Sequence, residues 1–116
     1  MRILDIEPVS PAEASALTPH LVEGEAADAA FASPTGSVLF TPLRLLLVTR
    51  EKLLEEKVET ASWPYREIRH FSIQDSEDGR AALRIWLGAE AQPLHLRARA
   101  GIDLGPLQRL LAERLG

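Results

Sequence analysis

The stretch from Val38 to Arg50 constrains the fold of this chain more than any other part of its sequence. It reads Val-Leu-Phe-Thr-Pro-Leu-Arg-Leu-Leu-Leu-Val-Thr-Arg, and Pro42 interrupts the run of strand-forming residues. Proline cannot donate a backbone hydrogen bond to a sheet, so it separates strands rather than continuing them. We therefore expect two strands here, at residues 37–41 and 43–50.

Alternation along the second of these strands predicts how it is covered. Successive side chains of a strand point to opposite faces. One face then carries Leu43, Leu45, Leu47 and Thr49, and the other carries Arg44, Leu46, Val48 and Arg50. A strand that packs on one side only does not need apolar residues at the middle of its second face. We therefore expect the second face to be covered as well.

Length, charge and cysteine content limit the classes of protein to consider. The chain has 116 residues, a formal net charge of -4 and no cysteine. This length suits one globular domain, and the acidic balance argues against nucleic-acid binding, which needs a basic surface. Disulfides, thiolate metal sites and a thiol nucleophile are excluded. No signal peptide or membrane-spanning run is visible, so we expect a cytoplasmic protein.

The remaining segments predict a mainly β chain with a helix near each end. Ser10-Pro11-Ala12-Glu13 has the pattern of a helix start. It predicts a short helix to about Leu17, which Thr18-Pro19 restarts or kinks towards Val22. A strand is expected at residues 57–63. The alanines of residues 26–33 favour a helix, but we interpret this segment as a strand, because residues 33–36 then form a hairpin turn. Three more strands follow from alternating apolar residues: Phe71 and Ile73; Leu83, Ile85 and Leu87; Leu94 and Leu96.

The C-terminal segment predicts an amphipathic helix. Asp103 is the expected N-cap, and one side of the helix carries Leu104, Leu107, Leu110, Leu111 and Leu115. Consecutive strands with short turns, closed by a helix that must bury its apolar side, predict an α+β, mainly β, barrel-like domain of about seven strands.

Four sequence blocks resemble the bacterial PH-domain family, formerly a domain of unknown function. They are Leu21-Val22-Glu23-Gly24-Glu25, Phe40-Thr41-Pro42-Leu43-Arg44-Leu45, Pro64-Tyr65-Arg66-Glu67-Ile68 and Leu83-Arg84-Ile85-Trp86. The resemblance implies a PH-like domain over residues 21–116, preceded by a segment at residues 1–20 with the short helix. It implies two near-orthogonal antiparallel sheets with the C-terminal helix at one end. It also implies ring-like homo-oligomers and no established enzymatic activity.

No group of residues has the spacing of an active site, a metal site or a cofactor site. His20, His70 and His95 fall on separate segments without metal-ligand spacing, so ordinary solvated or half-buried imidazoles are the better interpretation. Asp75, Glu77 and Asp78 share a turn but lack the glycine-centred loop of a calcium site. We therefore expect no catalytic residue, no metal and no cofactor.

The basic side chains of the last strand are the weak candidates for an anion site. His95, Arg97 and Arg99 share one face of that strand. Anionic lipid would need cations near the first hairpin, and residues 33–36 have none, so membrane binding is the alternative rather than the preferred function. Salt bridges to nearby acids or a solvated strand face explain these residues more simply.

An outward apolar face predicts self-association. Trp86 alternates with Leu83, Ile85 and Leu87, so it faces out if those residues fill the core, and Leu46 and Val48 lie on the second face of their strand. Either the N-terminal helix, through Leu17 and Leu21, covers this face, or a second copy does. We prefer the second copy, with Leu46, Val48 and Trp86 as interface residues. The prediction is a closed homo-oligomer larger than a dimer that acts as an interaction or scaffold module, with itself or another protein as partner.

Overall fold

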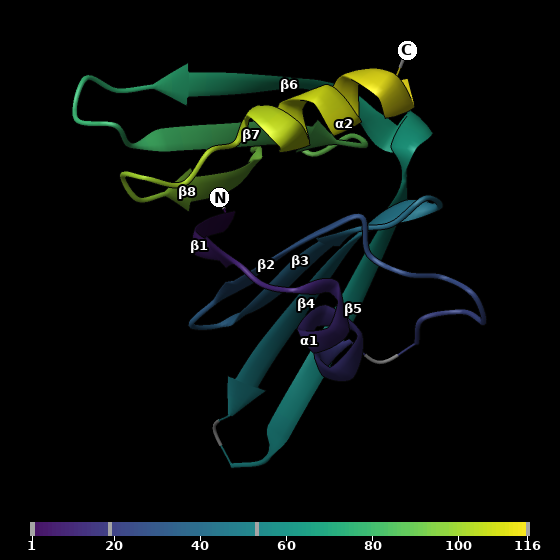
Figure 1. Cartoon of the computed structure of the whole chain (residues 1–116). Coiled ribbons are helices and arrows are strands. Elements are labelled where there is room, and N and C mark those ends of the chain that lie inside the picture. The colour runs from purple at the N-terminus through teal and green to yellow at the C-terminus, as the bar shows by residue number, and fades with distance from the viewer. Residues whose placement is uncertain (1, 19, 53, 116) are drawn as a thin grey trace. The chain divides into compact units, whose positions relative to one another are not determined.

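The computed structural model describes residues 2–18, 20–52 and 54–115, and within them the chain forms eight strands and two α-helices (Figure 1). The order is β1 (Arg2–Pro8), α1 (Pro11–Leu17), β2 (Ala29–Ser33), β3 (Gly36–Phe40), β4 (Arg44–Lys52), β5 (Glu56–Pro64), a 3-10 turn η1 (Tyr65–Glu67), β6 (Ile68–Asp75), β7 (Ala81–Leu87), β8 (Leu94–Ala98) and α2 (Gly105–Leu115). The chain divides into two compact units. The first is Pro8–Pro64, and the second combines Met1–Glu7 with Tyr65–Gly116. None of the helices in the described ranges is long and apolar enough to cross a membrane.

The unit Pro8–Pro64 is an antiparallel sheet in the order β5-β4-β3-β2. Its two central strands come from the stretch that is interrupted at Pro42, so this prediction is confirmed. The hairpin between β2 and β3 requires glycine at Gly36, because a Cβ atom there would lie 1.9 Å from the carbonyl oxygen of Val48. That close approach fixes the point at which β3 begins beside β4.

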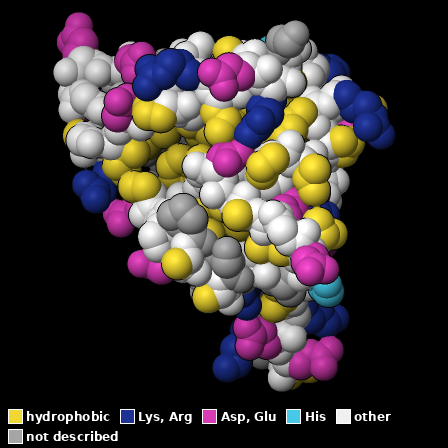
Figure 2. All heavy atoms as spheres, turned by 45° about the vertical axis from the view of Figure 1, so that its right-hand side comes forward, with side chains coloured by type: hydrophobic (Ala, Val, Ile, Leu, Met, Phe, Trp, Pro, Cys, Tyr) yellow, Lys and Arg dark blue, Asp and Glu magenta, His cyan; other side chains and the backbone are white. Residues whose placement is uncertain are grey.

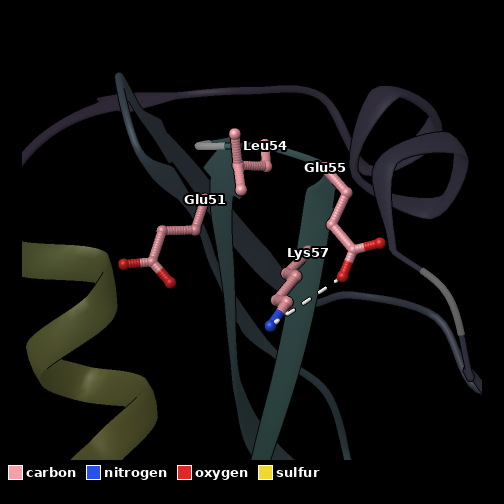
Figure 3. Close-up of a pocket in the computed structure, with 4 residues that line it drawn as sticks. All are labelled: Glu51, Leu54, Glu55 and Lys57. Carbon is pink, nitrogen blue, oxygen red and sulfur yellow. Dashed lines mark ion pairs between the residues drawn. The ribbon is translucent and has the colours of Figure 1, made fainter.

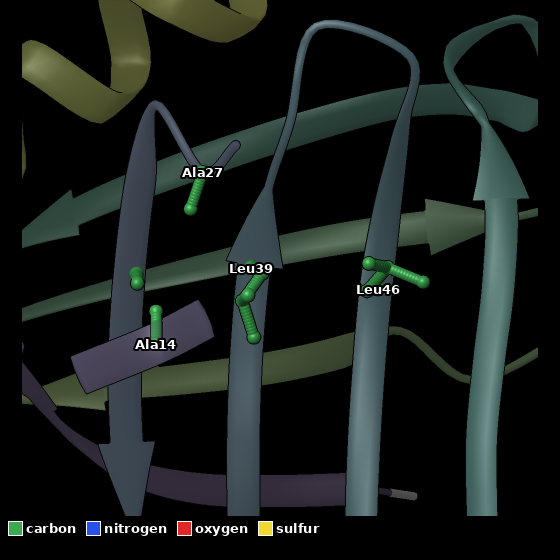
Figure 4. Packing of buried hydrophobic residues seen from close by; sticks show 5 residues of the cluster. Ala14, Ala27, Leu39 and Leu46 are labelled. Atoms are coloured by element: carbon green, nitrogen blue, oxygen red, sulfur yellow. The ribbon is translucent and has the colours of Figure 1, made fainter. Parts of the chain in front are cut away.

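Helix α1 packs on β2 and β3 of this unit (Figure 4). Ser10 caps it as expected, because its hydroxyl oxygen accepts a hydrogen bond from the Glu13 amide at 3.2 Å. The helix contributes Ala14 to a cluster of buried residues: Ala14, Ala27, Ala30, Leu39 and Leu46. Alanine side chains are short, so they let the helix and the sheet approach closely.

Both faces of β4 are covered, as alternation predicted. Leu45 and Leu47 on one face, and Leu46 and Val48 on the other, all have 2% or less of their surface exposed. The apolar residues on both faces of this strand therefore correctly predicted that it is packed on both sides.

The second unit is a sheet in the order β1-β8-β7-β6, with β1 parallel to β8 and the other pairs antiparallel. Along β7 buried and half-buried residues alternate, so Leu83, Ile85 and Leu87 fill the core. Helix α2 lies over the sheet of this unit and buries Leu107 and Leu111 (Figure 1). The Asp103 carboxylate accepts a hydrogen bond from the Gly105 amide at 2.8 Å, which satisfies one donor at the start of the helix.

Three expectations about the fold are corrected. The described residues form eight strands rather than about seven, because β1 was not predicted although Leu4 and Ile6 alternate with acids there. By hydrogen bonding the strands form one sheet in the order β5-β4-β3-β2-β1-β8-β7-β6 instead of two separate antiparallel sheets. The helix is not resumed after Thr18 in the described residues, which exclude Pro19, and His20 has a positive φ of 71° that no helix accepts.

Candidate interaction surfaces

A buried ion pair between Glu25 and Arg44 joins two loops at one end of the sheet in the unit Pro8–Pro64. The Glu25 side chain has no exposed surface, and it accepts hydrogen bonds from Arg44 at 2.8 and 3.0 Å. The Thr41 hydroxyl donates to the same carboxylate at 2.6 Å, and the Val22 amide donates at 3.1 Å. Arg44 also donates to the His20 carbonyl oxygen at 3.0 Å. A buried carboxylate with this many donors is held in its ionised form.

This ion pair brings together two of the four sequence blocks that carry the family resemblance. Glu25 ends the first block, and Thr41 and Arg44 belong to the second. The Gly24 backbone has a φ of 81°, which glycine adopts without strain, and the Glu25 amide donates to the Val22 carbonyl oxygen to close a turn. The two blocks therefore form two loops that the Glu25–Arg44 ion pair holds together, and we call this arrangement the double loop. Sequence reasoning did not predict it.

The Glu25 carboxylate makes stability depend on pH. Hydrogen bonds from Arg44 lower the pKa of Glu25 from 4.5 to about 2. A lowered folded-state pKa stabilises the fold above the unfolded-state pKa, and this stabilisation is lost as the pH falls through about 4.5 towards 2. The shift corresponds to about 3 kcal/mol at neutral pH.

We predict that the stability difference between the native chain and Glu25→Gln is largest at pH 7 and falls by about half at pH 3. Urea denaturation of both proteins at the two pH values measures it. A difference that stays constant with pH would contradict an ionised, buried Glu25.

Trp86 lies half-buried on the face of the second unit's sheet opposite its buried leucines, as alternation predicted. It stacks on exposed His70 of the neighbouring strand, with ring centroids 4.2 Å apart and an angle of 18° between the rings. The two residues are directly paired in the β6–β7 register. The stack joins β6, the last strand of the sheet, to β7, and it leaves Trp86 partly exposed.

The other two predicted interface residues lie differently. Leu46 is 1% exposed and belongs to the cluster beneath α1, and Val48 has no exposed surface. For Leu46 the chain's own N-terminal segment provides the cover, because Ala14 is a member of the cluster and Leu21 packs against it. The side chain of Leu17 lies outside the described residues. Alternation identified the second face correctly, but it contains no information about which segment covers it.

The predicted anion site has its arginines paired with acids of β1. Arg97 donates to Asp5 at 2.8 and 3.0 Å, and Arg99 donates to Glu7 at 2.8 Å. Parallel pairing of β1 with β8 places Asp5 directly beside Arg97. Because β1 was not predicted, these partners were not foreseen. Exposed pairs of this kind contribute little to stability, but they reduce the positive charge available to an anion.

His95 adds no cation to this face at neutral pH. Burial lowers the pKa of His95, and the neighbouring guanidinium groups of Arg84 and Arg97 lower it further, against the opposing effect of Asp5. Its Nε2 atom is buried and has no hydrogen-bond partner among the residues that the structure describes. A neutral imidazole does not provide the charge that binding a phosphate requires.

A pocket of about 520 Å³ lies at the tip of the β4–β5 hairpin, lined by Glu51, Leu54, Glu55 and Lys57 (Figure 3). Leu54 is fully exposed, and Lys57 forms an ion pair with Glu55 at 3.9 Å. The four lining residues that the structure describes are all exposed, so none of them is a buried acid or base.

On the face that Figure 2 shows, basic and acidic side chains stand next to one another (Figure 2). Within the described ranges, no group of three or more histidine, aspartate or glutamate side chains is arranged to hold a metal ion.

The fold and these surfaces define a PH-like domain, and comparison with known proteins identifies its family. The sequence profile of the bacterial PH domain matches residues 3–115, so the chain belongs to the bacterial PH-domain family. Protein YjqA of Bacillus subtilis (strain 168) is 33% identical over 95 residues, which cover 79% of this chain and 76% of YjqA.

Two crystal structures share the fold. A protein of the DUF1696 family with a pleckstrin-homology domain from Shewanella loihica PV-4 has a TM-score of 0.79 at 26% identity, covering 97% of this chain and 98% of its own. A pleckstrin-homology domain from Shewanella amazonensis SB2B has a TM-score of 0.69 at 27% identity, covering 90% and 96%. The family resemblance and the mainly β, PH-like fold with a C-terminal helix are thereby confirmed.

Proposed function

We propose that this protein is a non-enzymatic interaction module of the cytoplasm, which associates with copies of itself into a closed homo-oligomer larger than a dimer. The observation that carries the proposal is the stack of Trp86 on His70. It lies beside β6, which is the last strand of its sheet.

Tryptophan is among the residues that contribute most to protein interfaces, because its large rigid ring buries much apolar surface at a small entropic cost. Trp86 is partly exposed, whereas Leu46 is covered by residues of the same chain. A half-exposed ring that is already held by a stacking partner loses little freedom when a second protein covers it.

The alternative function, binding of anionic lipid, finds less support. The arginines that would bind phosphate are Arg97 and Arg99, and both donate to acids of the same chain. Binding lipid through them requires breaking those pairs, and the net charge of -4 opposes approach to an anionic surface. A protein partner, first of all a second copy, fits this surface better.

Light scattering after size exclusion tests the proposal. We expect the native chain to have the mass of a closed oligomer at high micromolar concentration, and Trp86→Glu to shift the mass towards the monomer while circular dichroism stays native. Val58→Glu is the matched control, because Val58 is 41% exposed on β5, at the other end of the strand order. A native chain that is monomeric at this concentration would overturn the proposal, and a Trp86→Glu variant of unchanged mass would remove Trp86 from the interface.

A further inference from the structure

One face of the second unit's sheet carries a cation next to an aromatic ring. On β7 this face holds Arg84 and Trp86, which alternate with the buried residues Leu83, Ile85 and Leu87. Both side chains are half-buried. They are two residues apart on one strand, so about 7 Å separates the points at which they leave the sheet. A ligand with a ring and a charged group can therefore contact both.

Among the described residues, the neighbours of Arg84 on this face include no acid. Ser72 of β6 and His95 of β8 lie directly beside it in the register. Its Nη1 atom donates to the side-chain oxygen of Gln74 at 3.2 Å, and this oxygen is neutral. Arg97 differs, because it pairs with an acid of β1. The half-buried guanidinium of Arg84 therefore keeps an uncompensated charge, which favours an anion beside it.

The Trp86 ring can stack on a second planar group. One of its faces contacts the His70 ring, with the centroids 4.2 Å apart and an angle of 18° between the rings. That stack uses one face of the ring, and the partial exposure of Trp86 shows that the chain does not cover the rest completely. Planar heterocycles stack on aromatic side chains of this kind, whatever their exact substituents.

We propose that the face around Arg84 and Trp86 binds a small planar aromatic anion, whose ring stacks on Trp86 and whose acidic group accepts hydrogen bonds from Arg84. Phosphate and carboxylate oxygens both accept paired hydrogen bonds from a guanidinium. A nucleoside monophosphate and an aromatic carboxylate with a short side chain therefore share the required chemistry. The Ser72 hydroxyl and the side-chain amide nitrogen of Gln74 are further donors on the same face.

A small anion fits this face better than a polyanion. The chain has a net charge of -4, and the β1 acids Asp5 and Glu7 are exposed beside Arg97 and Arg99. A row of phosphates, as in a nucleic acid or on a lipid surface, would meet these acids, whereas a single anion at Arg84 would not. The inference does not rest on self-association, although both proposals use Trp86.

Tryptophan fluorescence tests the site with adenosine monophosphate (AMP) as the probe. The chain has two tryptophans, so Trp63→Phe leaves Trp86 as the source of the signal. Excitation at the long-wavelength edge of tryptophan absorption avoids absorption by adenine. We expect AMP to quench Trp86 along a saturable curve, with a dissociation constant of about 0.1–1 mM. Calorimetric titration of the native chain measures the same affinity without a substitution. No saturation up to about 10 mM AMP in both measurements would overturn the proposal.

Three further probes separate the ring from the acidic group. Adenosine lacks the acid and inorganic phosphate lacks the ring, so each should bind at least about tenfold more weakly than AMP. Phenylpropionate represents the aromatic carboxylates, and its affinity relative to AMP shows which of the two sources the site prefers. Binding of inorganic phosphate as tight as that of AMP would overturn a role for the ring.

Arg84→Gln and Arg97→Gln are a matched pair of variants. Arg84→Gln removes the uncompensated charge and should weaken AMP binding by about tenfold or more. Arg97→Gln removes a guanidinium of the same face that already binds Asp5, so it should change the affinity by less than about threefold. Arg84→Lys keeps the charge and should bind AMP with an intermediate affinity. An equal loss in Arg84→Gln and Arg97→Gln would overturn the assignment to Arg84.

The outcomes separate this inference from the proposed function. Titrations at low and high micromolar protein concentration are compared with the mass from light scattering. A native chain that is monomeric and binds AMP overturns self-association and leaves the site intact. An oligomer that binds no AMP at either protein concentration overturns the site and leaves self-association intact.

Discussion

Arg44→Ala should lower the free energy of unfolding by about 3–5 kcal/mol at pH 7, because it leaves the Glu25 carboxylate buried without its cation. The Glu25 side chain has no exposed surface, and 22% of the Arg44 side chain is exposed, so water that enters in place of the guanidinium replaces only part of the lost charge interaction. The remaining donors, Thr41 and the Val22 amide, compensate only part of the charge. Urea denaturation followed by circular dichroism measures the change.

Arg50→Ala is the matched control for this prediction. Arg50 lies on the same strand and pairs with Glu56 at 3.6 Å, but 40% and 57% of the two side chains are exposed. Pairs exposed to this extent contribute at most about 1 kcal/mol. If Arg44→Ala cost no more than Arg50→Ala, the double loop would not depend on its ion pair.

Much of the fold was predictable because its signals are local. The alternation along β4 and β7, the break at Pro42 and the cap at Ser10 each depend on neighbouring residues, and each appears in the structure. The Glu25–Arg44 pair joins residues far apart in sequence, and nothing near Glu25 indicates its partner. Glu25 and Arg44 belong to two of the four sequence blocks that carry the family resemblance, but the resemblance assigned no role to either residue.

The candidate surfaces were less predictable for the same reason. Alternation placed Leu46 and Trp86 correctly on second faces, but Leu46 is covered by its own chain and Trp86 is not. Strand β1 was not predicted, so its two acids, Asp5 and Glu7, could not be placed beside Arg97 and Arg99 from the sequence. What covers a face depends on the arrangement of distant segments, which periodicity does not contain.

Leu111→Ala should lower the free energy of unfolding by about 2–5 kcal/mol, the cost of removing a leucine from a core that cannot collapse around the cavity. Leu111 has no exposed surface on the inner side of α2. Alanine favours the helix at least as well as leucine, so the loss comes from packing and not from the helix itself. The denaturation midpoint measures it.

Leu115→Ala provides the comparison within the same helix. Leu115 is 36% exposed in the last turn of α2, so its truncation should cost less than about 1 kcal/mol. The two variants have the same change in side chain and in helix propensity, and only burial distinguishes them. A Leu111→Ala midpoint equal to that of Leu115→Ala would mean that α2 does not pack on the sheet of its unit. A large difference would show that this helix completes the core on which the surface around Trp86 is held.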